Sequence, residues 1–326
     1  MSKPKSIFGA ALLGISFNDA ATVAQVLDIL KDVDVKQIDT APRYPPTSPG
    51  KSEDLLGEAH AASKAFEIDS KVVIAPGIDR ATRAASIQQS VGETLGRLGS
   101  QKVGNAPLYS RLFTLGIRDP LGNLPLEEQV NVLDECYHEG LFRQLGVVGF
   151  QPDQLQRFLE AASIGKHVRP LIYQGEYNVI TRGMERKILP LLRANNMAYY
   201  AHCPLAAGFL TGNFTKGQYA GTRFAVDHSL HSIFHQRYDV PALHEAVRKL
   251  EVAGRQHNIS VRELSLRWIF FHSVLGPGDG VITGCTSIEQ IRENAQSIAN
   301  GPLPESLVES VEEIWSSLAE GRSGVL

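Results

Sequence analysis

An aspartate and a tyrosine five residues apart are the strongest candidates for chemistry in this 326-residue sequence. Residues 35–38 are predicted to form a short buried strand, Asp39 lies where this strand ends, and Tyr44 lies in the loop beyond it. This spacing can place a carboxylate and a phenol in one pocket. A phenol can protonate a carbonyl oxygen if its surroundings lower its pKa from about 10 towards neutrality. The pair therefore indicates acid–base chemistry on a carbonyl compound.

Two further ionisable side chains lie at predicted strand ends. Glu176 and His202 are candidates for proton transfer, and their structural alternatives are a solvated carboxylate and a hydrogen-bonded imidazole. Three more histidines have irregular spacing and no carboxylate cluster beside them, so we expect no metal site there. These are His228, His231 and His235.

The elements that must position these groups alternate between strand and helix eight times. Such an alternation predicts parallel strands, and eight repeats favour a closed (α/β)8 TIM barrel over a doubly wound sheet. No Gly-x-Gly-x-x-Gly motif follows the first strand, which argues against a Rossmann domain. In a barrel, chemistry is located at the carboxyl ends of the strands. The expected strands are 7–13, 35–38, 71–75, 112–117, 142–149, 170–174, 197–203 and 280–283. A long loop is expected at about 204–239, and a helix at 261–271.

The composition indicates an ordinary globular enzyme. Apolar residues make up 43% and charged residues 21%, with a net charge of −3, so neither a nucleic-acid nor a membrane partner is expected. Three distant cysteines are typical of reduced thiols in a cytoplasmic protein, and the amino-terminal segment does not resemble a secretory signal. We expect one domain over residues 1–326, as a monomer or homodimer.

Four motifs in order along the chain resemble the aldo-keto reductases, and most closely their aflatoxin-aldehyde and succinic-semialdehyde reductase branch. They are Ile-Asp-Thr-Ala-x-x-Tyr (38–44), Tyr-Gln-Gly-x-Tyr-Asn-x-Ile-Thr-Arg (173–182), Pro-Leu-Ala-x-Gly-Phe-Leu-Thr-Gly (204–212) and Gly-Cys-Thr-Ser-Ile-Glu-Gln-Ile-Arg-Glu-Asn (284–294). The resemblance runs from about Ile7 to Trp315. It implies an (α/β)8 barrel that binds NADPH and reduces carbonyls with an Asp, Tyr, Lys and His set.

Carried over residue by residue, the resemblance gives Asp39 and Tyr44 the first two of these roles. The tyrosine protonates the carbonyl oxygen, while the lysine, held by the aspartate, lowers the pKa of the phenol. The histidine orients the substrate. The resemblance also implies NADP(H)-binding residues, without a metal. These are Gln174, Tyr177, Leu205, Gly208, Arg223, Gly284, Thr286, Ser287, Gln290 and Asn294.

The lysine and histidine of the family do not carry over. The family strand that reads Ile-Ala-Thr-Lys aligns with residues 74–77, which places Gly77 at the lysine position. Lys71 is expected ~20 Å away, at the other mouth of the barrel, since strand residues rise ~3.3 Å each. Gly116 stands at the histidine position, and Val148 and Gly149 replace the Ser-Asn that grips the nicotinamide amide.

Three functions follow. The preferred one is non-redox acid–base chemistry, such as dehydration, cyclisation or isomerisation, on a carbonyl-bearing small molecule of secondary metabolism. Tyr44 would act there with Asp39, Glu176 or His202. The second is an NADPH-dependent aldehyde or ketone reductase with a rearranged proton relay. The third is a non-catalytic relative that binds NADP or serves as an accessory subunit.

Overall fold

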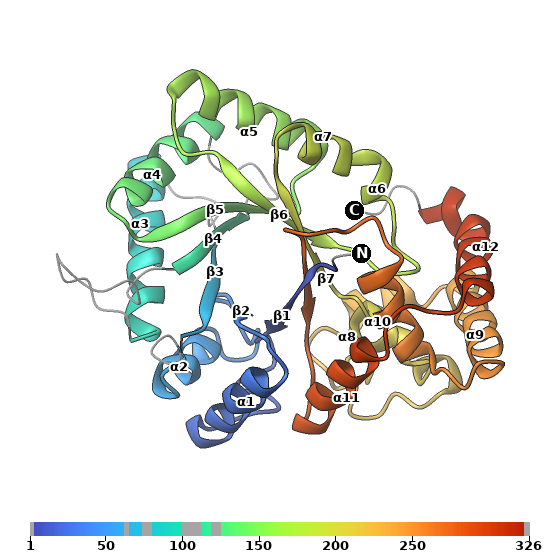
Figure 1. Ribbon diagram of the computed structural model, residues 1–326. Helices are drawn as coiled ribbons and strands as arrows, with labels where there is room; N and C mark the ends of the chain where they lie inside the picture. The colour runs from blue at the N-terminus through green and yellow to red at the C-terminus, as the bar shows by residue number, and fades with distance from the viewer. Residues whose placement is uncertain (1–2, 62–64, 74–79, 100–111, 119–124, 323–326) are drawn as a thin grey trace.

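Eight parallel strands close into a barrel in sequence order, and β1 pairs with both β2 and β8 (Figure 1). The computed structural model describes residues 3–61, 65–73, 80–99, 112–118 and 125–322. The (α/β)8 barrel predicted from the strand–helix alternation is therefore confirmed. The strands are β1 (Lys5–Gly9), β2 (Gln37–Asp39), β3 (Glu67–Val73), β4 (Leu112–Arg118), β5 (Phe142–Val148), β6 (Pro170–Glu176), β7 (Ala198–His202) and β8 (Gly280–Thr283).

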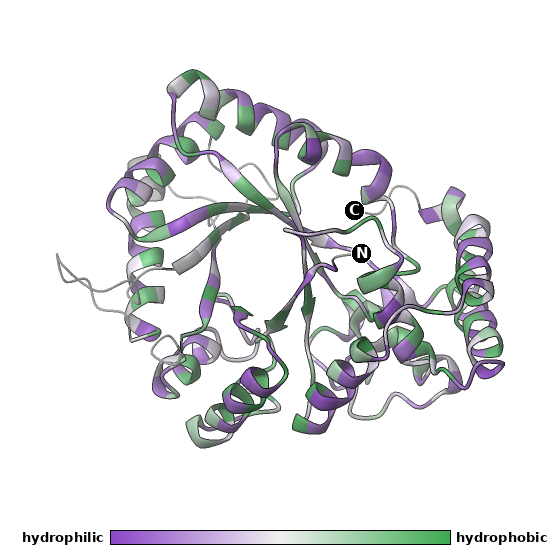
Figure 2. Cartoon of the chain, viewed as in Figure 1, coloured by the Kyte–Doolittle hydropathy of each residue, from purple (hydrophilic) through white to green (hydrophobic). Residues whose placement is uncertain are grey.

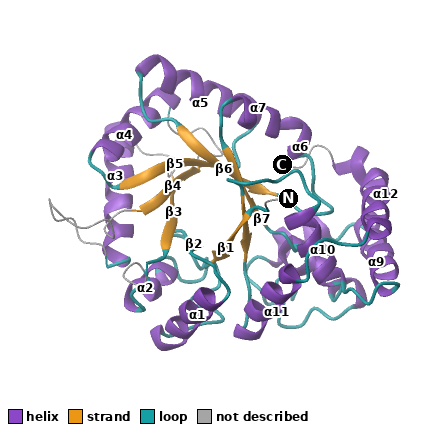
Figure 3. Ribbon diagram, viewed as in Figure 1, coloured by secondary structure: helices purple, strands orange, loops and turns teal. Residues whose placement is uncertain are grey.

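Helices surround the strands on the outside of the barrel (Figure 3). No helix within the described ranges combines the length and the apolar composition that crossing a membrane requires. The helices are α1 (Ala20–Asp32), α2 (Lys51–Glu58), α3 (Arg80–Arg97), α4 (Leu126–His138), α5 (Pro152–Gly165), α6 (Met184–Lys187), α7 (Leu189–Ala194), α8 (His231–Tyr238), α9 (Pro241–Arg255), α10 (Val261–Phe271), α11 (Ile288–Ala299) and α12 (Glu305–Arg322), with 3₁₀ helices η2 (Ala206–Thr211) and η3 (Phe214–Lys216).

Helix α1 illustrates how the sequence forms these outer elements. The Asp19 side chain accepts a hydrogen bond from the backbone N–H of Thr22 and so caps the first turn. Val23, Val26 and Leu27 recur at helical spacing and are fully buried. Figure 2 shows the resulting mixture of hydrophobic and hydrophilic residues along the outer helices.

Apolar packing is divided unequally between the outside and the inside of the barrel. One extensive cluster unites the strands with their helices, whereas a second cluster contains only four buried residues, all from strands. These four are Ile7, Ile172, Tyr200 and Ile282. The strands also bury polar side chains, which include Gln37, Asp39, Asp69, Lys71 and Gln174. The axis of the barrel is therefore largely polar.

The third strand differs from the prediction in a way that changes the site. It spans Glu67–Val73, whereas the sequence analysis places it at 71–75. The sequence lacks the apolar pattern from which a buried strand is predicted, because the buried positions 69 and 71 carry Asp69 and Lys71. Lys71 consequently lies near the carboxyl end of the strand and pairs in register with Gly116 of β4.

Candidate functional site

Lys71 and Asp39 form a buried ion pair at the carboxyl ends of β2 and β3. The ammonium Nζ lies 2.7 Å from Oδ1 of Asp39, and it also donates to the backbone carbonyl of Thr40 at 2.8 Å. Asp39 and the phenol of Tyr44 together raise the pKa of Lys71 against the opposing effect of its burial. Lys71 is thus a fixed cation at the position where the sequence analysis expects none.

Tyr44 lies over this cation. The ammonium of Lys71 is 5.2 Å from the centroid of the Tyr44 ring. The backbone N–H of Tyr44 donates to Ala41 at 2.9 Å, and its carbonyl accepts from Ser52 at 3.1 Å, so the loop after β2 turns back towards the barrel. Asp39, Lys71 and Tyr44 therefore form one group, although they come from two strands and a loop.

The prediction that no lysine reaches this group is wrong. Its physical cause is the misplaced start of β3, which put Lys71 at the beginning of the strand and not near its end. The Ile-Ala-Thr-Lys pattern has a match at Ile68-Asp69-Ser70-Lys71 that would have revealed the lysine. The Gly77 prediction lies outside the described residues. Gly116 does stand next to Lys71 in register, at the place expected for the histidine.

Gln174 and Tyr177 of the β6 motif have different environments. The amide of Gln174 donates to Oδ1 of Asp39 at 2.7 Å, so it helps to hold the ion pair. Tyr177 is fully buried, and its hydroxyl donates to Glu185 at 2.7 Å. Its ring packs against Trp268 of α10. This environment does not support the prediction that the ring contacts the cofactor, because Tyr177 packs against α10 and its hydroxyl is engaged by Glu185.

Glu176 serves as an anchor for α8. The Tyr238 hydroxyl donates to its Oε1 at 2.5 Å, and Nη1 of Arg237 lies 2.7 Å from its Oε2. Glu176 is 2% exposed. Since both carboxylate oxygens are engaged by one helix, this arrangement does not support the prediction that Glu176 is a base open to a substrate.

His202 ends β7 directly opposite Glu176 and is half-buried. Burial lowers the pKa of its imidazole to about 4; nearby Arg237 and Lys71 act in the same direction, while Glu176 and Asp39 oppose them. The ring is thus neutral at physiological pH. Lys71 and Asp39 are close enough to influence the pKa of this imidazole. A neutral ring at this place can serve as a hydrogen-bonding or packing group.

Gly116 and Val148 occupy a shared space. A Cβ atom at Gly116 would lie 3.1 Å from Cγ2 of Val148 and 3.4 Å from Cγ of Lys71. The first distance is tighter than normal packing permits without a shift. The two departures from the family pattern are therefore linked, since the Val148 side chain takes up room that a larger residue at 116 needs. Gly149, next to Val148, has a positive φ of 67°.

Arg223 and the end of β8 form a second group, which suits an anion. The position of a Cβ on Gly284 is 3.9 Å from Nη2 of Arg223. Helix α11 begins just beyond, and Ser287 caps it by accepting from the N–H of Gln290. The N–H of Thr286 donates to Oε1 of Gln290 at 2.9 Å. A guanidinium beside a helix N-terminus offers the donors that a phosphate requires.

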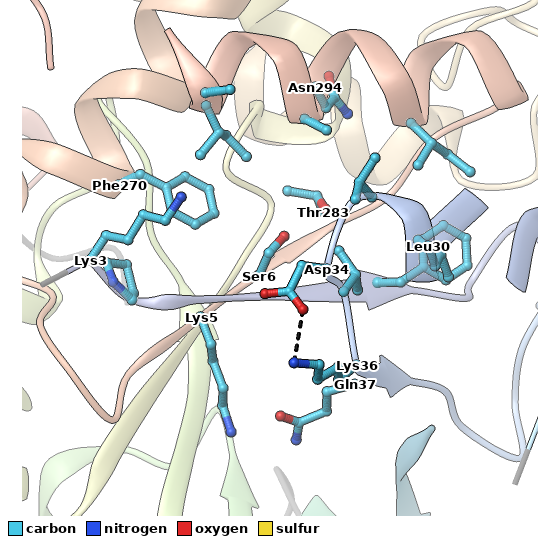
Figure 4. Close-up of a pocket in the computed structure, with 18 of the residues that line it drawn as sticks. Lys3, Lys5, Ser6, Leu30, Asp34, Lys36, Gln37, Phe270, Thr283 and Asn294 are labelled. Atoms are coloured by element: carbon cyan, nitrogen blue, oxygen red, sulfur yellow. Dashed lines mark ion pairs between the residues drawn. The ribbon is translucent and has the colours of Figure 1, made fainter. Parts of the chain in front are cut away.

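The remaining predicted cofactor residues, Leu205, Gly208 and Asn294, lie in the turn after β7 and on helix α11. Leu205 and Gly208 form the turn after β7, where the carbonyl of Leu205 accepts from the N–H of Gly208 at 2.9 Å. Gly208 has a φ of 101°, and no atom lies within 4 Å of a Cβ built there. Asn294 is buried two turns along α11 and lines a groove between α11 and α1 (Figure 4).

The chain is similar to known proteins over almost its whole length. The sequence model of the Aldo/keto reductase family matches residues 6–316. The chain is 29% identical over 299 residues to Oxidoreductase sirO of Leptosphaeria maculans, covering 91% of this chain and 86% of that protein. It is 28% identical over 333 residues to human Aflatoxin B1 aldehyde reductase member 4, covering 98% and 96%. Aldo-keto reductase pigE of Monascus ruber is 26% identical over 334 residues, covering 96% and 94%.

Proposed function

Because the chain belongs to the aldo/keto reductase family, we propose that it is an NADPH-dependent reductase of aldehydes or ketones. One observation carries this proposal. The ammonium of Lys71 is held by Asp39 and lies against the ring of Tyr44. A fixed cation beside a phenol stabilises the phenolate that forms, and this makes the phenol a stronger general acid near neutral pH.

The residues divide the proton chemistry as follows. The Tyr44 hydroxyl donates its proton to the carbonyl oxygen as negative charge develops there. Lys71 stabilises the resulting phenolate, and Asp39, supported by Gln174, keeps the ammonium in place and charged. NADPH, when bound, supplies the hydride that reduces the carbonyl carbon. A proton from solvent then restores the phenol.

The site lacks an imidazole at position 116, which sets this proposal apart from the full four-residue mechanism. Gly116 has no side chain to orient the carbonyl oxygen, and Val148 makes that wall apolar. Orientation therefore depends on Tyr44 and on shape. We expect substrates with apolar groups next to the carbonyl, and we expect slower turnover than a site with all four groups would give.

The residues at the end of β8 fit the phosphates of NADPH. The Arg223 guanidinium beside Gly284 offers a fork of donors, and the first turn of α11 adds backbone N–H groups and a positive dipole. Arg223 and Gly284 would hold the phosphates, together with the α11 N-terminus. The catalytic group and this anion-binding group both lie at the carboxyl ends of strands, as a dinucleotide bridging them requires.

The non-redox alternative loses the argument on which it was based. It rested on a Tyr44 without a neighbouring cation, and Lys71 supplies that cation. Glu176, which was to serve as a base, is engaged by α8. The non-catalytic alternative makes a different prediction, namely nucleotide binding without turnover, and the same experiment tests it.

The test combines nucleotide binding with turnover. We expect NADPH fluorescence to increase on binding, and NADPH to be oxidised in the presence of 4-nitrobenzaldehyde or 9,10-phenanthrenequinone. Tyr44→Phe should lower kcat by about 10²–10⁴-fold without changing the Kd for NADPH. Arg223→Ala should raise that Kd by about tenfold or more. The surface variant Tyr219→Phe serves as the control. Binding without turnover of any carbonyl, or turnover that survives in Tyr44→Phe, would refute the proposal.

A further inference from the structure

A second carboxyl group lies in the barrel interior directly beside the Lys71–Asp39 pair. Asp69 is in register with Asp39 on β2 and with Thr114 on β4, and it precedes Lys71 by two residues on β3. Residues two apart on a strand share a face, so Asp69 and Lys71 both point into the barrel. Asp69 is 4% exposed. It stands where the Ile-Ala-Thr-Lys pattern has alanine.

The partners of Asp69 leave it incompletely satisfied. The amide of Gln37 donates to its Oδ2 at 2.6 Å, and Gln37 in turn lies 3.5 Å from the hydroxyl of Tyr200 on β7. In the part of the chain that the structure describes, Oδ1 of Asp69 makes no hydrogen bond of normal geometry, although the Thr114 hydroxyl is near enough to lower the pKa of the carboxyl group. A buried carboxylate with an unpaired oxygen is costly, and a proton on that oxygen relieves the cost.

Charged and polar groups from three other strands, β1, β2 and β4, act on this carboxyl group. Burial, followed by the charge of Asp39, raises the pKa of Asp69 to about 7, while the Thr114 hydroxyl, Gln37 and the Lys5 ammonium act in the opposite direction. In turn, the charge of Asp69 helps to raise the pKa of Lys71. Asp69 therefore exchanges its proton in the range in which enzymes usually work.

The groove between α1 and α11 approaches this carboxyl group from the amino-terminal ends of the strands. It has a volume of about 1070 Å³, opens at the starts of β1, β2 and β3 and is lined by Lys5, Gln37 and Glu67, among others. Figure 4 shows the side chains of Lys5 and Gln37 on the same side of β1. Gln37 both lines the groove and binds Asp69. Gln37 thus lies between Asp69 and the groove.

We propose that Asp69 is a positioning residue for the catalytic group: its protonation state determines whether Lys71 faces one negative charge or two. The proposal rests on the function proposed above for Lys71 and Tyr44. With Asp69 protonated, the ammonium is free to stabilise the Tyr44 phenolate. With Asp69 ionised, part of that stabilisation is lost and Tyr44 becomes a weaker acid. Carbonyl reduction should therefore decline as the pH rises through neutrality.

A titration of the nucleotide-free protein tests the electrostatic link without turnover. The ultraviolet difference between wild type and Tyr44→Phe isolates the Tyr44 phenolate, and the same difference is measured in an Asp69→Asn background. We expect the phenolate to form at a pH lower by roughly 0.5–1.5 units when Asp69 is replaced. Glu67→Gln, which removes a carboxylate from the same strand at the groove, is the matched control and should give a much smaller shift. An unchanged phenolate titration in a folded Asp69→Asn protein would overturn the proposal.

A second measurement uses the wild-type chain, so it does not depend on the folding of a variant. With ¹³C at the aspartate carboxyl carbons, one resonance should titrate near pH 7, well above the ordinary range for aspartate. If no aspartate titrates between pH 6 and 8, the proposal is wrong.

The pH profile of kcat/KM then connects Asp69 to the reaction. With NADPH and 4-nitrobenzaldehyde, we expect the wild-type value to fall by about 3- to 30-fold between pH 6 and 8.5. Asp69→Asn should be flat over this range, while Glu67→Gln should keep the decline. A decline that persists in Asp69→Asn would overturn the proposal. Absence of turnover in wild type would refute the proposed function alone, because the two titrations still decide the role of Asp69.

Discussion

The ammonium of Lys71 lies 2.7 Å from Oδ1 of Asp39, and both side chains are less than a tenth exposed. A pair this deeply buried is costly to form, yet breaking it is costlier because one charge remains alone. The Thr40 carbonyl and the Gln174 amide complete the environment of the two groups. Their placement is therefore a fixed property of the barrel, and substrate binding is not needed to create it.

Lys71→Met should separate stability from catalysis. Removal of the ammonium leaves the Asp39 carboxylate buried without its counter-ion, although the Gln174 amide still donates to it, so we expect a loss of about 3–5 kcal/mol in the free energy of unfolding. The double variant Lys71→Met/Asp39→Asn removes both charges and should recover most of this loss in urea unfolding. Its kcat should nevertheless stay about 10²–10⁴-fold below wild type. Recovery of activity together with stability would show that Lys71 is only structural.

Gly116 and Val148 should respond non-additively to substitution. Gly116→His alone forces its Cβ against Cγ2 of Val148, so we expect about 1–3 kcal/mol of destabilisation and no gain in activity. Val148→Ser alone should have a small effect. In the double variant the new side chain has room, and thermal unfolding should return towards wild type. A double-mutant cycle measures this interaction, and additive effects would contradict the shared space inferred for the two positions.

His202 should make the wild-type protein sensitive to acid. The pKa of its imidazole is lowered to about 4 from the ordinary 6.5, so the folded state binds fewer protons than the unfolded state between these values. Its stabilising contribution is therefore complete above pH 6.5 and is lost as the pH falls towards 4. His202→Phe removes this dependence. Relative to the variant, wild type should lose about 2 kcal/mol between pH 7 and pH 4, as measured by urea unfolding. A constant difference across this range would contradict the assignment.

Glu176 should affect nucleotide binding through α8. Glu176→Ala leaves the fully buried hydroxyl of Tyr238 without its partner and releases Arg237, at a cost of about 2–3 kcal/mol. Since Arg223 lies in the segment leading to α8, we expect the Kd for NADPH to rise by about 3- to 10-fold. Hydrogen exchange in α8 should accelerate as well. Glu176→Gln keeps an acceptor for Tyr238 and should show a smaller effect on both measurements. Equal behaviour of the two variants would argue against the anchoring role.

The fold was predictable because the outer packing follows simple periodicity. Helix α10 was expected at Val261–Phe271 and β8 at Gly280–Thr283, and both have these bounds in the structure. In α10 the apolar residues Val261, Leu264 and Trp268 recur at helical spacing, and in β8 Val281 and Ile282 are buried. The segment 204–239, expected as a long loop, contains α8 and two 3₁₀ helices. Only Tyr238 of α8 is buried, so this helix lacks the apolar stripe that reveals a helix in a sequence.

The sequence predicts Asp39 and Tyr44 as site residues but misses Lys71, because the strands were located from hydrophobic patterns. The strand expected at 35–38 overlaps β2, Gln37–Asp39, so the prediction finds the strand that carries Asp39 and precedes Tyr44, with bounds shifted by one or two residues. Lys71 lies on a strand in which charged residues face the barrel interior, and there hydrophobic alternation gives the wrong boundary. Partners such as Arg237 for Glu176 are 61 positions away, and no spacing rule connects them. The ionic contacts of the site depend on barrel closure, which local sequence does not encode.

The barrel axis and its outer layer contribute differently to the molecule. Because the extensive apolar cluster joins the strands to the helices, the fold is held together mainly from outside the barrel. The inside can then carry acids, a lysine and amides without removing the main source of cohesion. Along one strand, the residues that face the axis thus serve the chemistry, and the residues that face the helices serve the packing. Substitutions on one face need not affect the other. Redesign of the chemistry along the axis should be compatible with an unchanged outer layer.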